Sequence, residues 1–185
     1  MRRRTFKSLR LGLVVISCLF ILSAKRGLAA SPTENEVKAV LLFHLTQFVT
    51  WPTNASQSPD FLIGILGPDP FGDSLDAVMK GEKVGTRAIR IVRSNRAREL
   101  IDCSLVYVSP QAREPLSQIF NVLKELPTLT VGENDDFIDD GGMIRFKPND
   151  RKIRLQVQLP RARSQGFNIS AQLLRVSDVV QGDAK

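Results

Sequence analysis

Short apolar segments alternate with helix-like segments through the middle of this 185-residue chain, and this alternation constrains the fold more than any other feature. Segments with helical spacing, Phe71 to Met79 and Ala112 to Glu125, follow the first and the third of four strand-like runs. The four runs are Phe61 to Leu66, Ala88 to Val92, Ser104 to Val108 and Thr128 to Val131. Because strands connected through helices usually pair in parallel, the sequence predicts a largely parallel sheet.

Two further segments flank this alternation. Glu34 to Val49 places apolar residues at helical spacing and Trp51-Pro52 ends it, which predicts an amphipathic first helix. Met143 to Phe146 and Lys152 to Leu159 alternate in polarity around Pro148-Asn149-Asp150, which predicts an antiparallel β-hairpin. We therefore expect a single α/β domain with a mostly parallel central sheet flanked by helices, a C-terminal antiparallel β-hairpin and a short final helix.

The last part of the chain predicts two details of that hairpin and helix. In the second arm, Arg154, Gln156 and Gln158 share one face, and such alternation is typical of a strand with one face in water. Ser170 to Val176 is expected to close the chain as a short helix, with Ser170 as its N-cap.

The first 30 residues have the pattern of a secretory signal peptide. A basic region from Arg2 to Arg10 precedes an apolar run from Leu11 to Leu22, and Leu28 to Ala30 supplies a cleavage site. The apolar run is shorter than the roughly 20 residues that span a bilayer as a helix. We therefore predict cleavage near Ala30 and export of residues 31–185 from the cytoplasm, with a lipoprotein anchored at Cys18 as the alternative.

Loss of this segment would change both the charge and the cysteine content. The whole chain has 26 lysines and arginines against 19 acidic residues, and seven of the bases lie in the predicted signal. The exported chain is then formally neutral, which argues against nucleic-acid binding and against insertion into or attraction to a membrane. Cys103 becomes the single cysteine, which rules out an intramolecular disulfide, and its place before an apolar strand predicts a buried side chain.

Residues suited to catalysis or cofactor binding are sparse. His44 is the sole histidine and lies on a mainly apolar helix face, which is typical of a core or rim residue. One histidine and one cysteine cannot supply a usual zinc site, and the acidic segment from Glu133 to Asp140 lacks the spacing of an EF-hand loop. Gly64, Gly67 and Gly72 match no nucleotide-binding motif. The sequence therefore predicts no catalytic residue, no metal and no cofactor.

Seven short motifs, each unspecific alone, follow one another in a characteristic order. They are Lys38-Ala39 with Phe48 to Pro52, Ile65 to Gly72, Asp102-Cys103, Leu129 to Gly132, Phe137, Gly141 to Ile144 and Ile169 to Leu174. This ordered set covers nearly all of residues 31–185 and resembles the YfiR family of periplasmic proteins.

Many of the motif residues have a simple structural interpretation. Trp51-Pro52 suits helix termination with the ring packed at the sheet edge, Gly141-Gly142 suits a positive φ before the hairpin, and Phe71 suits a strand-to-helix turn. The motif residues expected to serve the fold are Lys38, Trp51, Pro52, Gly67, Phe71, Cys103, Gly141, Gly142, Ser170, Leu173 and Leu174.

The resemblance implies a function in signalling. Family members of this kind repress an inner-membrane diguanylate cyclase by binding its periplasmic sensory domain, which lowers cyclic-di-GMP and biofilm formation. The resemblance also implies a homodimer that is not itself an enzyme. The paired cysteines of the best-known member are missing here, so a disulfide switch does not carry over.

Two hypotheses about binding follow. For a protein partner, we expect exposed groups in the last third of the chain to form the interface, with Phe137, Met143, Phe146, Gln156 and Ile169 as candidates. The alternative is a solute-binding or sensor module that acts with another membrane receptor or kinase. Its ligand would lie near Gly67 to Gly72, at the carboxyl ends of the parallel strands.

Overall fold

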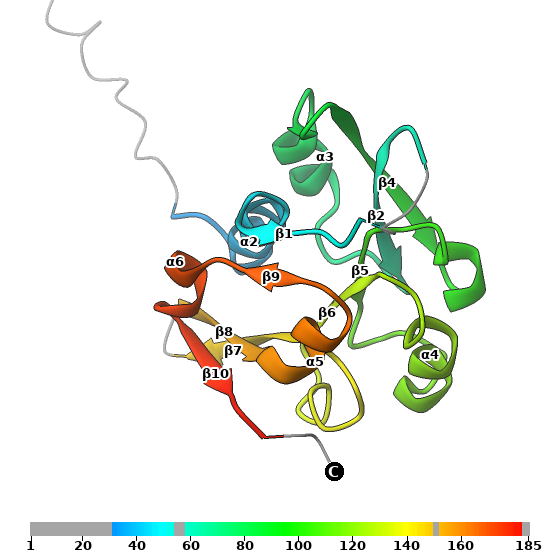
Figure 1. Ribbon diagram of the computed structural model, residues 1–185. Coiled ribbons are helices and arrows are strands. Elements are labelled where there is room, and N and C mark those ends of the chain that lie inside the picture. Colours follow the sequence, from blue (N-terminus) through cyan, green and yellow to red (C-terminus); the bar gives the residue numbers. More distant parts are fainter. Residues whose placement is uncertain (1–30, 54–57, 150–151, 183–185) are drawn as a thin grey trace, which may run out of the picture. The chain divides into compact units, whose positions relative to one another are not determined.

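The computed structural model describes residues 31–53, 58–149 and 152–182, and most of its strands form one sheet. These strands are β2 (Phe61–Leu66), β3 (Lys83–Val84), β4 (Arg87–Ser94), β5 (Leu105–Val108), β6 (Leu129–Gly132), β7 (Ile144–Asn149), β8 (Lys152–Gln158) and β10 (Ser177–Val180). Their order across the sheet is β10-β8-β7-β6-β5-β2-β4-β3 (Figure 1). The predicted signal peptide and Cys18 lie outside the described residues.

The centre of the sheet is parallel, as the alternation predicts. Strands β4, β2, β5, β6 and β7 pair in parallel, with Ile63 opposite Ile91 on one side and Leu105 on the other. Strand β8 then returns antiparallel to β7 and places Val157 opposite Ile144, so the predicted hairpin is confirmed. The expected turn is wrong in part, because Pro148 and Asn149 continue β7 and pair with Ile153 and Lys152. The expected α/β fold class is therefore correct.

Helices cover the sheet. They are α2 (Glu34–Phe48), α3 (Asp73–Met79), α4 (Leu116–Leu123), α5 (Leu159–Ser164), α6 (Ala171–Leu174) and the 3₁₀ helix η1 (Ala97–Leu100). Within the described residues, none of the helices is long and apolar enough to cross a membrane. Two short strands, β1 (Val49–Thr50) and β9 (Asn168–Ile169), pair antiparallel beside the main sheet.

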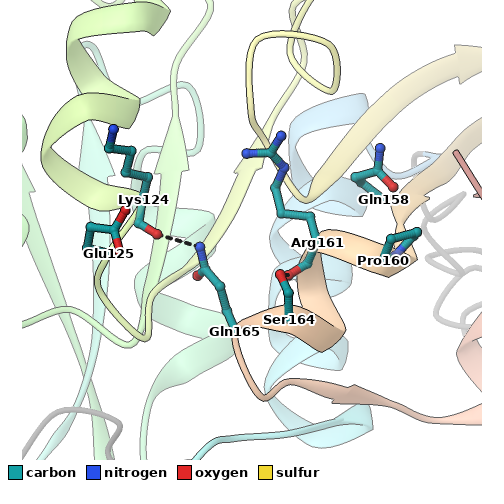
Figure 2. A pocket seen from close by; sticks show the side chains of 7 residues that line it. All are labelled: Lys124, Glu125, Gln158, Pro160, Arg161, Ser164 and Gln165. Carbon is teal, nitrogen blue, oxygen red and sulfur yellow. Dashed lines mark hydrogen bonds between the residues drawn. The ribbon is translucent and has the colours of Figure 1, made fainter. Parts of the chain in front are cut away.

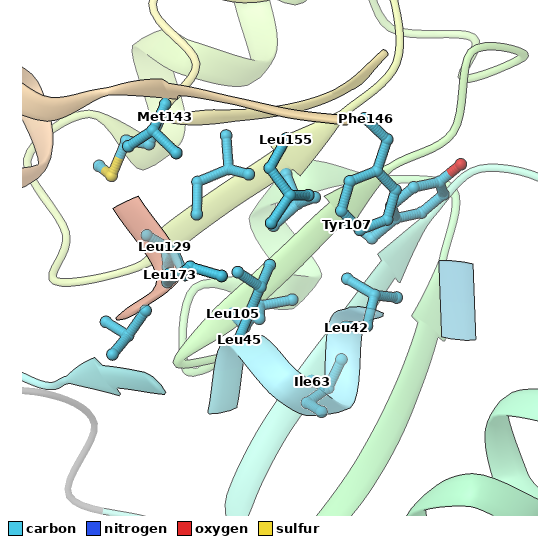
Figure 3. Close-up of a cluster of buried hydrophobic side chains, with 14 of the residues drawn as sticks. Leu42, Leu45, Ile63, Leu105, Tyr107, Leu129, Met143, Phe146, Leu155 and Leu173 are labelled. Atoms are coloured by element: carbon cyan, nitrogen blue, oxygen red, sulfur yellow. The ribbon is translucent and has the colours of Figure 1, made fainter. Parts of the chain in front are cut away.

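Successive residues of the central strands enter two different cores. Ile65 and Tyr107 belong to the cluster that packs with α2 and α3, part of which is drawn in Figure 3. The next residues, Leu66 and Val108, belong to the cluster that packs with η1 and α4. Because both faces are buried, the central strands read as nearly continuous apolar runs.

Helix α2 begins with a complete capping box. The Thr33 hydroxyl accepts from the Glu36 backbone N–H, and the Glu36 carboxylate accepts from the Thr33 backbone N–H. The helix ends at Phe48, one residue before the expected end, because Val49 is already extended and pairs with Ile169.

The expected end of the chain is wrong in two respects. The final helix is shorter than predicted, Ala171–Leu174, although Ser170 does cap it by accepting from the Leu173 N–H. It also does not close the chain, because β10 follows and pairs in parallel with β8, with Val179 opposite Val157. A strand at this position covers the edge of β8, which would otherwise expose unpaired backbone groups.

Two further elements differ from the sequence prediction. Helix α4 begins only after Pro115, so its first four expected residues are not helical. Strand β8 ends one residue early and α5 begins with Leu159-Pro160, because proline lacks the N–H that a further ladder bond requires. The expected wet face of β8 fails at Gln158, which is 1% exposed because β10 and α5 enclose it.

Candidate functional site

An open apolar groove lies between the first helix and the C-terminal part of the chain, with a volume of about 340 Å³. Its walls come from α2, β8 and α6, and from Val176 between α6 and β10. The lining residues are Leu41, His44 and Phe48 of α2, Ile153 and Leu155 of β8, Gln172 and Leu173 of α6, and Val176.

Helix α2 can line this groove because its apolar residues cover more than one side. Leu42 and Leu45 are fully buried against the sheet, whereas Leu41 and Phe48 on the neighbouring strip are half-buried. A helix that packs against one surface needs an apolar stripe of only about 100°. The second strip therefore leaves apolar surface that the described part of the chain does not fully cover.

The rim of the groove combines exposed apolar groups with one imidazole. Val176 is 67% exposed, which is unusual for a large apolar side chain beside a groove. His44 is exposed and its ring meets the edge of Phe48 at 5.9 Å between centroids, so it occupies a rim position, as predicted. This composition suits apolar side chains of a protein partner better than a chemical reaction.

A buried polar network fastens the same helix to the sheet. Lys38 is 5% exposed, and its ammonium donates to Glu133 at 2.7 Å and pairs with Glu34 at 2.6 Å. The Tyr107 hydroxyl donates to the second oxygen of Glu133. Burial alone would lower the pKa of Lys38, but the bonds and charges of Glu133 and Glu34 outweigh it and raise that pKa.

The protonation states of Lys38 and Tyr107 suit a structural role for this network better than a catalytic one. Burial, followed by the bond to Glu133 and its charge, raises the pKa of the Tyr107 hydroxyl far above its usual range. An ammonium that stays charged and a phenol that stays neutral are poor nucleophiles and poor bases at neutral pH. Lys38 therefore holds α2 at the carboxyl end of β6, where Glu133 follows the strand.

Part of the sheet edge where the solute hypothesis placed a ligand is closely packed, whereas a Cβ on Gly72 would have no atom within 4 Å. The strand order changes direction between β2 and β5, where α/β sheets commonly bind ligands. At Gly67, a Cβ would lie only 2.9 Å from the Cα of Ala112. The Ser109 N–H donates to the Leu66 carbonyl at 2.9 Å, and Phe71 is buried with its ring 4.8 Å from that of Tyr107. Gly67 and Phe71 thus serve packing, and a ligand at this edge stays a prediction.

The expectation that the interface candidates are exposed is wrong for four of the five. Phe137, Met143, Phe146 and Ile169 are at most 4% exposed. The alternating pattern of the hairpin region correctly marks one apolar face, but that face packs into the two cores, so it is unavailable to a partner. Gln156 is half-buried between β7 and β10, and its role in binding stays a prediction.

The ring of Phe137 explains the glycines of its motif. A Cβ on Gly142 would lie 2.2 Å from this ring, and a Cβ on Gly132 would lie 2.3 Å from it. Gly141 has φ +125°, a conformation that other residues rarely adopt, which agrees with the prediction of a positive φ before the hairpin. Glycine is therefore required at these positions because the backbone at Gly132 and Gly142 packs directly against the ring of Phe137.

The remaining motif residues also serve packing. Trp51 meets Phe61 of β2 edge-on at 4.8 Å between ring centroids, which agrees with the expected packing at the sheet. Pro52 lies against Gly166, where a Cβ would be 3.0 Å from the proline ring. Cys103 is 3% exposed, as expected, and burial together with the charge of Asp102 raises the pKa of its thiol to about 12. Leu174 is half-buried and packs against the first core.

The groove itself was not predicted from the sequence, because helical spacing alone does not say which apolar residues of the first helix the rest of the chain covers. A signal was present in the run from Ala39 to Phe43, where five consecutive apolar residues exceed what one buried stripe needs. Such a run indicates that a second side of the helix is in apolar contact, although the sequence does not show which segment or molecule makes that contact.

Comparisons with known proteins agree with this fold. Residues 35–178 match the protein family described as YfiR/HmsC-like. Among solved structures, a conserved domain protein from Vibrio cholerae O1 biovar El Tor has a TM-score of 0.56 at 9% identity over 80% of this chain. An ABC domain from Streptococcus pneumonia, solved in complex with L-Trp, has a TM-score of 0.44 at 9% identity, covering 69% of this chain and 57% of its own.

The likeness to the Vibrio protein extends to the fold alone, and this chain spans 60% of that protein's length. No curated protein matches the sequence.

Proposed function

Because this chain belongs to the YfiR/HmsC-like family, we propose that it is a periplasmic regulatory protein that binds a membrane signalling protein and holds it inactive. The proposed partner is the periplasmic sensory domain of an inner-membrane diguanylate cyclase, so binding lowers cyclic-di-GMP and biofilm formation. We further propose that residues 31–185 act as a homodimer after signal cleavage, without catalysis of their own.

The observation that carries this proposal is the apolar groove beside α2. Leu41 and Phe48 are half-buried and Val176 is mostly exposed, so apolar surface is left open to an outside partner. The near-neutral charge of residues 31–185 makes apolar contact a better source of affinity than charge attraction. We assign the groove to apolar side chains of the partner's sensory domain.

Repression requires that the groove distinguish two states of the partner. A protein that binds both states equally shifts nothing, and a complete switch requires about a 10⁴-fold preference for one of them. An apolar groove supplies such a preference when the matching side chains of the partner are exposed in the inactive state and covered in the active state. Release then follows from any signal that favours the covered state.

Two substitutions test the groove against a matched control. Val176→Asp places a charge inside the groove, whereas Val40→Asp changes another exposed valine, 39% exposed, that does not line it. Each variant is expressed from the chromosome in place of the wild-type gene, and cyclic-di-GMP is measured together with the amount of exported protein.

We expect the wild type and Val40→Asp to keep cyclic-di-GMP low, and Val176→Asp to raise it to the level of the deletion strain. Full repression by Val176→Asp at an equal protein level would show that the groove is not the contact surface. Unchanged cyclic-di-GMP on deletion of the gene would refute the cyclase as the partner, and would favour a sensor module that acts with another receptor or kinase.

A further inference from the structure

A second hollow, separate from the apolar groove, lies where α4 ends and α5 begins, and its volume is about 290 Å³ (Figure 2). It shares no lining residue with the groove, and most of its lining side chains are polar. The lining residues are Lys124, Glu125, Gln158, Pro160, Arg161, Ser164 and Gln165.

Arg161 brings an uncompensated positive charge to this hollow. Its Nε atom is buried and has no hydrogen-bond partner, and no carboxylate among the described residues pairs with its guanidinium. The guanidinium also lies against the backbone of Gly141, where an added Cβ would be 3.2 Å from Nη1. A guanidinium held in this way is suited to a carboxylate, which it binds through two parallel hydrogen bonds.

Two amide oxygens of the same hollow lack donors. Gln158 is 1% exposed, and the Oε1 atoms of Gln158 and Gln165 are both buried without a hydrogen-bond partner among the described residues. The side-chain nitrogens of both glutamines already donate hydrogen bonds. Gln158 Nε2 donates to the Gly182 carbonyl at 2.9 Å, and Gln165 Nε2 donates to the Lys124 carbonyl at 2.6 Å. Because these bonds fix the orientation of each amide, the oxygens remain as acceptors.

The combination defines the chemistry of a ligand. Arg161 and Lys124 require an anionic group, while the two glutamine oxygens and the carboxylate of Glu125 require hydroxyl or N–H donors. A simple inorganic anion meets the first requirement but brings negative charge toward Glu125. A molecule that carries both a carboxylate and hydroxyls meets both, and the volume suits one of monosaccharide size.

We propose that this hollow binds a small hydroxy-carboxylate of the sugar-acid class, with its carboxylate on Arg161 and its hydroxyls on Gln158 and Gln165. The site is separate from the groove assigned to the protein partner, so the two proposals stand or fall independently.

The test uses the exported protein purified from the periplasm and two matched arginine variants. D-glucuronate is the probe, D-glucose lacks its carboxylate, and inorganic phosphate lacks its ring of hydroxyls. Arg161→Gln removes the cation of the site, and Arg163→Gln removes an exposed cation of the same helix that does not line the hollow. Binding is measured by calorimetry, and the melting temperature is recorded against ligand concentration.

We expect D-glucuronate to raise the melting temperature saturably in the wild type and in Arg163→Gln, with at least tenfold weaker binding to Arg161→Gln. Gln165→Ala should weaken D-glucuronate binding several-fold without changing the melting temperature of the free protein by more than a few degrees. Binding of D-glucose as tight as that of D-glucuronate would overturn the carboxylate assignment. An equal effect of phosphate, or no binding of D-glucuronate, D-galacturonate and D-gluconate to the wild type, would overturn the proposal.

Discussion

Substitution of Gly142 by alanine should destabilise this protein more than any other single methyl group we can place on its backbone. The added Cβ would lie 2.2 Å from both Cδ1 and Cε1 of Phe137 and 2.6 Å from the Phe137 carbonyl oxygen. The ring cannot retreat, because the position of a Cβ on Gly132 is only 2.3 Å from its other edge, and Phe137 is 0% exposed. The backbone itself must therefore shift.

The expected cost is about 3 kcal/mol, the upper part of the usual range for overpacking, because both the ring and a backbone oxygen obstruct the methyl group. This is a large fraction of the roughly 5–15 kcal/mol by which a domain is stable. With a urea m-value of about 2 kcal/mol/M, the midpoint of unfolding should fall by about 1.5 M while the slope stays the same.

Urea titration followed by circular dichroism measures this change. Gly182→Ala is the control, because a Cβ there has no atom within 4 Å, and its midpoint should equal that of the wild type. In a Phe137→Ala background, Gly142→Ala should cost much less, since the obstructing ring is gone. A midpoint for Gly142→Ala within about 0.3 M of the wild type, or an undiminished cost in the Phe137→Ala background, would refute the packing argument.

Three smaller predictions follow from the other buried groups. Lys38→Met should lower the free energy of unfolding by about 3 kcal/mol because it leaves Glu133 without its cation. Folding raises the pKa of Lys38 above 10.5, so this loss should be full below pH 10.5 and should shrink as the pH rises toward the folded-state pKa. Denaturation of both proteins at pH 8 and pH 11 would measure the difference. Cys103 is buried and its thiol pKa is raised to about 12, so it should resist iodoacetamide at pH 8 in the native protein and react in urea. Mass spectrometry measures the labelled fraction, and rapid labelling of the native protein would contradict the burial of Cys103. Ser170→Ala should lower the free energy of unfolding by about 1 kcal/mol through loss of the α6 cap, whereas Ser170→Asp should retain most of it.

The central sheet could be predicted because burial on both faces makes its strands easy to recognise. The run from Phe61 to Leu66 is apolar on both faces, has a strand's length and ends at a turn signal. The β7–β8 hairpin was equally accessible, since its alternation survives in the structure. The spacing of apolar residues shows which faces of a segment are buried, and for these strands that information is enough to predict their place in the sheet.

Strand β10 and the exposure of the candidate residues could not be read in the same way. Ser177 to Val180 is four residues of mixed polarity, and only its pairing with β8 makes it a strand. Phe146 and Gln156 illustrate the second limit, because alternation separates two faces but does not say what covers either one. The hollow at Arg161 depends on two distant segments meeting, residues 124–125 and 158–165, which no spacing within one segment predicts.

The late arrival of β10 has a consequence for how the chain is made. The backbone edge of β8 stays open until Ser177 to Val180 have been synthesised, because they are its parallel partner. A chain that emerges from its N-terminus therefore passes through a stage in which most of the sheet is complete but one long edge can pair with another molecule. Truncation after Val176 should keep the edge of β8 open and so increase pairing between molecules, because the four residues of β10 replace that longer edge in the folded protein.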